Sequence, residues 1–201
     1  MRMTMPIASR RLFPVAAMAM ALTGCVSFGA EPPPSLITLT PELTVPAGGG
    51  ASGNAEDALT VIEPVAPARI AVNRVPVQVD DTTVQYLKDA VWVEKPARLF
   101  RRLLSDTISA KTGKLVIDGN DPAFRTRTQL RGTLVEFGYD ARTSSVVVRY
   151  DAIRESEGNA LVTRRFESVV PGVIAEVGPV GDAINRAAND VAGQVADWMA
   201  E

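Results

Sequence analysis

Hydrophobic and polar positions alternate along the second half of the chain in the pattern of β-strands. Residues 128–139, 143–154 and, less regularly, 160–170 place apolar side chains at every second position, which is typical of strands with one buried face. The side chains expected to face the core include Val135, Phe137, Tyr139, Val146, Val148, Tyr150, Ala152, Val162 and Phe166. Short polar segments at 140–142 and 156–159 separate the runs. Connections of this length join antiparallel neighbours, so we expect a three-stranded meander.

Two segments have the periodicity of amphipathic helices. The first begins at Pro96, which is tolerated at a first helical position, and Gly113 is placed to end it. Its apolar face holds Leu99, Phe100, Leu103, Leu104 and Ile108. Its other face carries Arg98, Arg101 and Arg102, which we expect to be solvated rather than a binding patch. The second helix covers about 180–199, with one apolar stripe from Ile184 to Met199.

Three shorter segments complete the predicted fold. Residues 69–77 and 84–87 are expected to be strands, the first ending or lying at an edge because of Pro76. The apolar run 115–117 follows the first helix and fits a parallel strand that completes a βαβ unit. The pattern therefore predicts an α+β fold. Its mixed sheet has one βαβ unit, an antiparallel three-stranded meander and a C-terminal helix, with both helices on one face.

The amino-terminal segment predicts export and lipid attachment. Residues 1–11 are basic without an acid, and residues 12–22 form an apolar region of 11 residues, too short for a membrane span of roughly 20. Residues 1–24 are therefore predicted to be a signal peptide. The sequence Leu22-Thr23-Gly24-Cys25 resembles a bacterial lipobox, which implies that Cys25 is lipidated. Val26 stands where an Asp would favour inner-membrane retention, which favours the outer membrane by analogy.

Residues 25–58 are predicted to be the lipidated cysteine and a flexible tether, and residues 59–201 a periplasmic domain. The tether segment is rich in Pro, Gly and Ala, with three consecutive prolines at 32–34, and such composition buries too little apolar surface to fold by itself. One apolar patch at 36–39 interrupts it. That patch is either part of the tether or an edge strand that docks on the domain.

Charge and composition exclude several function classes. After removal of residues 1–24 the chain holds 21 − 3 = 18 basic and 23 acidic residues, which does not favour nucleic acid as a partner. Histidine is absent, so the usual general base and metal ligand are missing. The acidic pairs Asp80/Asp81 and Asp118/Asp121 lie beside predicted turns, where Asp is favoured structurally. We therefore predict no catalytic residues, no metal site, no cofactor and no enzyme activity.

The segment Val91-Trp92-Val93-Glu94-Lys95-Pro96-Ala97-Arg98-Leu99 leads into the first helix. It resembles the tryptophan-alanine-glutamate-proline-leucine stretch of the ABC-type transport auxiliary lipoprotein family, which includes paraquat-inducible protein C. The resemblance covers roughly residues 59–201 and the lipobox. Val93 departs from the usual alanine, and Lys95 is inserted before the proline.

The resemblance implies a non-catalytic accessory subunit of an ABC transport system with a mammalian-cell-entry (MCE) domain protein, which moves lipids or other hydrophobic molecules. The protein would be lipid-anchored at the periplasmic face of the outer membrane and dock the periplasmic component. Trp92, Tyr86 and Glu94 are the predicted partner contacts, although Trp92 equally fits a core residue that clamps the helix start. The sequence leaves open whether the protein forms a homo-oligomer.

Three alternatives differ from this function. Another outer-membrane assembly lipoprotein would lack neighbouring genes for an ATPase, a permease and an MCE-domain protein. A lipid-binding carrier would need a cavity for an acyl chain between sheet and helix. A hydrolase would need a nucleophile with an adjacent base, and the absence of histidine makes it the weakest alternative.

Overall fold

The structure is a computed structural model that describes residues 35–119, 126–158 and 160–201. Cys25 and the predicted signal peptide lie outside the described residues. The elements, in chain order, are η1 (Ala55–Asp57), β1 (Leu59–Val61), β2 (Arg74–Gln78), β3 (Val84–Val91), α1 (Pro96–Thr112), β4 (Val116–Asp118), β5 (Thr128–Asp140), β6 (Ser145–Ser156), β7 (Ala160–Pro171) and α2 (Val177–Ala200).

The long strand β5 organises a mixed sheet of seven strands within the described residues. On one side β5 pairs with β6 and β6 pairs with β7, all antiparallel, which confirms the predicted meander. On the other side the first half of β5 pairs with β1 and its second half with β2. Beyond these, β4 lies next to β1, and β3 lies next to β2.

The α+β fold is confirmed, but the parallel neighbour of β4 differs from the expected one. β4 pairs with β1, whose three residues were too few to stand out as a strand. The expected strand 69–77 begins only at Arg74, because residues 68–73 form turns. In that turn segment Arg69 donates a hydrogen bond of 2.9 Å to the carbonyl of Val135 on β5. A side chain thus holds the loop against the sheet where a longer strand was expected.

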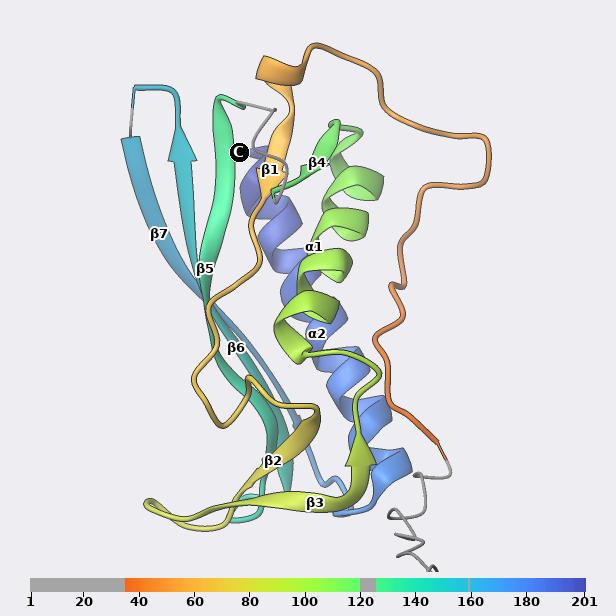
Figure 1. The fold of residues 1–201 in the computed structure, drawn as a ribbon, viewed down its shortest axis with the longest axis vertical. Coiled ribbons are helices and arrows are strands. Elements are labelled where there is room, and N and C mark those ends of the chain that lie inside the picture. The colour runs from red at the N-terminus through yellow and green to blue at the C-terminus, as the bar shows by residue number, and fades with distance from the viewer. Residues whose placement is uncertain (1–34, 120–125, 159) are drawn as a thin grey trace, which may run out of the picture. The chain divides into compact units, whose positions relative to one another are not determined.

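Both helices cover the same face of the sheet, as predicted (Figure 1). α1 has Pro96 at its first positions and ends at Gly113, whose φ of 67° is the left-handed conformation that favours glycine. The small residues Ala187, Ala188 and Ala192 of α2 are fully buried, which allows close packing. The prediction that Arg101 is solvated was wrong, because this residue is only 7% exposed.

A β-bulge in β5 decides which side chains enter the core. The register with β6 shifts between Leu134 and Glu136, and such a shift moves the following residues to the other face. Leu134 and Phe137 are therefore both fully buried, although strict alternation would separate them. Val135, which the alternation places in the core, is only half-buried.

The apolar patch at 36–39 docks on the domain, which is the second of the two alternatives for this segment. Ile37 lies in a parallel bridge with Trp92 and is 9% exposed. Its backbone N–H donates to the carbonyl of Val91 at 2.8 Å, and its carbonyl accepts from Val93 at 3.0 Å. We call residues 37–42 the strap. From Ile37 the chain runs alongside α2 (Figure 1).

Candidate functional site

Trp92 lies in the hydrophobic core. Its side chain is 1% exposed, and its ring centroid lies 5.5 Å from that of Phe137. Phe137 continues into an aromatic cluster through Phe100, 6.1 Å away, which contacts Tyr150 at 5.4 Å. Trp92 is therefore a core residue in the structure and not an exposed partner contact. The ring offers no surface to a partner.

Tyr86 lies on β3 opposite Pro76 of β2 and is half-buried. The guanidinium of Arg74 lies 4.8 Å from the centre of the Tyr86 ring, which is a cation–π distance. Because Arg74 is exposed, the pair forms part of the surface. Tyr86 therefore keeps a solvent-facing position in which a partner can reach it.

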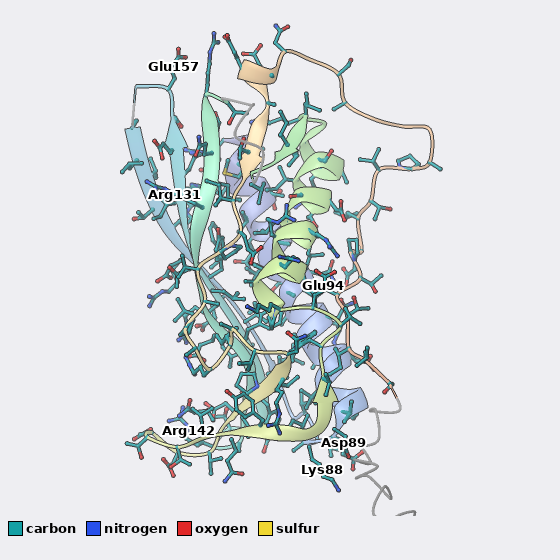
Figure 2. The ribbon with its side chains drawn as sticks, in the orientation of Figure 1. Lys88, Asp89, Glu94, Arg131, Arg142 and Glu157 are labelled. Carbon is teal, nitrogen blue, oxygen red and sulfur yellow. The ribbon has the colours of Figure 1, made fainter. Side chains whose placement is uncertain are left out.

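Glu94 lies just before α1 (Figure 2), and it already has cationic partners on that helix. Its two carboxylate oxygens accept hydrogen bonds from Arg102 at 2.7 and 3.3 Å. Arg98 lies 3.8 Å from Glu94 and 3.7 Å from Glu63. These bonds link Glu94, just before α1, to arginines on the exposed face of the helix. Trp92, Tyr86 and Glu94 share no hydrogen bond, ion pair or ring contact, so the structure does not join these three described residues into one site.

A groove of about 470 Å³ lies over β5 and β6. It is on the face of the sheet that carries Val147 and Arg149, opposite the face on which Val148 is buried. Its charged lining consists of three arginines, Arg69, Arg142 and Arg149, and three carboxylates, Asp81, Glu136 and Asp140. Gly138 forms part of its wall, and a methyl group there would lie 2.4 Å from the carbonyl oxygen of Pro76. β2 approaches β5 closely only because this residue has no side chain.

The arginines of the groove are all paired with carboxylates. Arg69 lies 2.8 Å from Glu136, and Arg142 lies 2.7 Å from Asp140 and 2.5 Å from Asp81. The hydrogen bonds from Arg142 hold the pKa of the Asp140 carboxyl below its usual range. Three positive and three negative side chains leave the lining without net charge. The groove is thus polar and electrically balanced, and it favours neither a bare anion nor an acyl chain.

The outward face of the meander carries a ladder of cross-strand ion pairs. Arg165 of β7 donates to both carboxylate oxygens of Asp151 on β6, at 2.6 and 2.7 Å. These bonds hold the pKa of Asp151 below its usual range. Nε of Arg149 on β6 donates to one carboxylate oxygen of Glu167 on β7. The face is therefore polar and self-neutralised, and exposed pairs of this kind contribute little to stability.

The exposed edge of the sheet is β7, a feature that the sequence pattern did not single out. All twelve residues of β7 pair with β6, and no strand within the described residues pairs with the opposite edge. Leu161, Val162 and Val169 are 56%, 44% and 49% exposed. The other long edge, β3, is covered at its end by Ile37. The side-chain amide of Gln194 on α2 donates to the carbonyl of Glu167 at 3.4 Å. An edge strand of this length still presents other backbone groups that another chain can bind.

Two further properties concern the described residues alone. No three acidic, histidine or cysteine side chains among them gather closely enough to hold a metal ion. None of the described helices combines the length and the apolar character needed to cross a membrane.

Comparisons with known proteins agree with this fold. A crystal structure of a protein from Xanthomonas campestris superposes with a TM-score of 0.69 at 16% identity, covering 82% of this chain and 94% of that one. A second crystal structure, of an uncharacterised protein, gives a TM-score of 0.63 at 14% identity and covers 82% and 99%. No curated protein matches. The family model of the ABC-type transport auxiliary lipoprotein component matches residues 39–196. The chain therefore belongs to the ABC-type transport auxiliary lipoprotein family.

Proposed function

We propose that this protein is a non-catalytic accessory subunit of an ABC-type lipid transport system. A lipid on Cys25 holds it at the periplasmic face of the outer membrane, and the domain docks the MCE-domain protein of the system. Family membership supports the transport role. The lipobox around Cys25 supports the lipid anchor, and Val26 supports the location at the outer membrane.

The observation that carries the docking role is the exposed edge of β7. Docking requires backbone groups or apolar side chains at the surface, and β7 offers both along twelve residues. A partner strand added there would extend the sheet, because main-chain hydrogen bonds supply affinity in this mode. Leu161 and Val169 lie near the two ends of the strand and are each about half exposed. They would contact alternate side chains of the added strand.

Tyr86 and Glu94 remain a second proposed contact region, at β3 and the start of α1. Val93 lies between Trp92 and Glu94 and is 42% exposed. A partner at this region would therefore meet Val93 and Tyr86, with Trp92 supporting the surface from the core. The two regions make different predictions, because β7 and the β3–α1 junction can be altered separately.

The test is affinity capture of the full-length lipidated protein co-expressed with an MCE-domain protein from the same bacterium. We expect the wild type to recover the MCE-domain protein and the double variant Leu161→Lys/Val169→Lys to lose at least tenfold, about 1.4 kcal/mol, because lysine on an edge strand opposes strand addition. Val65→Lys is the control, since Val65 is 69% exposed and bridges to Thr133 of β5, whereas β7 pairs only with β6. It should bind normally.

Each other result changes the proposal in a defined way. If Val93→Lys abolishes capture and the β7 variant does not, the contact lies at the β3–α1 junction. If the wild type captures outer-membrane assembly proteins instead, the docking role is wrong and the first alternative replaces it. If it yields only bound lipid, the carrier function replaces it, although the charged lining of the described groove does not favour an acyl chain.

A further inference from the structure

The strap is clamped to α2 by two asparagines one helical turn apart. The N–H of Thr40 donates to Oδ1 of Asn185 at 2.8 Å, and the N–H of Glu42 donates to Oδ1 of Asn189 at 2.8 Å. The side-chain amide of Asn189 also donates to the carbonyl of Thr40 at 2.9 Å. Asn189 is only 7% exposed. The strap backbone is thus bonded to the helix much as a strand is bonded to its neighbour.

Ile37 fixes the beginning of the strap at one end of the domain. It packs beside Gly181, where an added methyl group would lie 3.6 Å from Cγ2 of Ile37. Gly181 is the fifth residue of the 24-residue helix α2. Ile37 therefore lies at the end of the domain where α2 begins, well away from Glu201.

Three turns gather at this end, which we call the near end. They are residues 79–83, 141–144 and 172–176. The ion pair of Arg142 with Asp81, 2.5 Å, joins the first two, and the N–H of Val173 donates to the carbonyl of Ser144 at 2.9 Å. Figure 2 shows Arg142, Lys88 and Asp89 at this end and Glu157 at the opposite, far end.

The clamp shortens the chain that can act as a tether. From Cys25 to Ile37 there are 37 − 25 = 12 residue steps. A flexible chain of that length spans about 17–21 Å on average, from ~5–6 Å × √n, and at most about 40 Å when fully extended. The far end lies 201 − 181 = 20 residues further along α2, or about 30 Å at 1.5 Å per residue.

These lengths decide which end approaches the lipid. If the far end faced the bilayer, the tether would have to run back about 30 Å beside the domain, close to its full extension, and lose most of its conformational freedom. With the near end toward the bilayer, the average tether length is enough. The orientation follows from where the strap is clamped and needs no contact with the lipid.

We infer that the near end is the membrane-facing surface of this domain and that the strap, by ending the tether at Ile37, sets this orientation. The occupant of the surface is the lipid bilayer. Ile174 is 65% exposed and Val79 is 36% exposed at this end, and such side chains are favoured at a lipid interface. The acids Asp80, Asp81, Asp89 and Glu176 outnumber Lys88 and Arg142 there, so anionic lipids do not attract it. The inference rests on the proposed anchor at Cys25.

The experiment uses full-length lipidated protein in nanodiscs of phosphatidylethanolamine and phosphatidylglycerol that contain a headgroup spin label. Cys25 is the only cysteine of the chain, and its thiol is blocked by the lipid, so a fluorophore can be placed at Ile174→Cys or at Glu157→Cys. We expect quenching at least threefold stronger at residue 174 than at residue 157. Equal or stronger quenching at residue 157 would overturn the orientation.

Two insertions test the role of the strap. Twelve Gly/Ser residues inserted after Gly29 lengthen the tether before the clamp, and we expect quenching at residue 174 to fall roughly twofold, as the doubled chain spans √2 times the distance. The same insertion after Gly50, beyond the clamp, should leave it unchanged. Equal effects of the two insertions would overturn the inference alone. Mass spectrometry that finds no lipid on Cys25 would overturn the anchor and the inference together.

Discussion

The phenol of Tyr139 donates a buried hydrogen bond of 2.9 Å to the backbone carbonyl of Val173. This bond joins the end of β5 to the loop that leads into α2, and both residues are at least 92% buried. The other side-chain hydrogen bonds found among the described residues lie at exposed or half-buried positions, on the helices and the strap as well as on the sheet. A second core tyrosine provides a contrast, since the Tyr150 hydroxyl has no partner among the described residues.

The first prediction uses this pair of tyrosines. Tyr139→Phe should lower the free energy of unfolding by about 1–2 kcal/mol, because the Val173 carbonyl loses its partner in a buried position. Tyr150→Phe should be neutral or stabilise by up to ~1 kcal/mol, because it removes a buried hydroxyl without a described partner. Urea unfolding of the two variants measures both values. A loss of more than 1 kcal/mol in Tyr150→Phe would mean that its hydroxyl is bonded after all.

The second prediction concerns the close approach of β2 and β5. Gly138→Ala would place a methyl group 2.4 Å from the Pro76 carbonyl, so the strands must separate, and we expect a loss of about 1–3 kcal/mol. Gly178→Ala on α2 is the control, since no atom lies within 4 Å of the added group. Alanine is the better helix former, so this variant should be neutral or slightly more stable. Thermal unfolding of both would show whether the groove wall depends on Gly138.

Local signals in the sequence were enough for the helices and the meander. Pro96 and Gly113 mark the two ends of α1 because they act through their own backbone conformations. The turn at 141–144 is likewise short and polar. These features depend on neighbouring residues alone, so a single sequence contains the information needed to predict them.

Features that depend on distant residues could not be predicted. The bulge between Leu134 and Glu136 arises from pairing with β6, and nothing in β5 itself marks it. The strap is held by Asn185 and Asn189, which lie about 145 residues further along the chain. The position of Trp92 was ambiguous because a tryptophan before a helix suits a core and an interface equally well. Its burial is decided by Phe137, on another strand.

The third prediction separates stability from partner binding at the β3–α1 junction. Trp92→Ala should lower the free energy of unfolding by about 3–5 kcal/mol, because it empties a core position that contacts Phe137. Val93→Lys should change it by less than ~0.5 kcal/mol, because this side chain is exposed. Loss of a partner in Trp92→Ala would therefore report unfolding. Circular dichroism melts beside the capture assay would reveal it, and a fully stable Trp92→Ala protein would contradict the core packing.

The fourth prediction concerns acid stability. Arg165 holds the folded-state pKa of Asp151 below its usual range, so this carboxylate contributes stability that is fully present above its unfolded pKa of about 3.9. That contribution is lost as the pH falls through the lower, folded pKa. Arg165→Gln returns the folded pKa toward the unfolded value and removes the contribution at all pH values. The variant should thus lose less stability than the wild type between pH 6 and pH 2.5.

The control for this prediction is Arg186→Gln on α2, which removes the same charge from an exposed position that does not contact Asp151. General repulsion among positive charges at low pH destabilises every variant, and the loss of one positive charge relieves it equally in both. Only the specific pairing with Asp151 differs between them. Melting temperatures at pH 6 and pH 2.5 should therefore drop less in Arg165→Gln than in Arg186→Gln. Equal drops would mean that the ion pair seen on the outward face does not persist in solution.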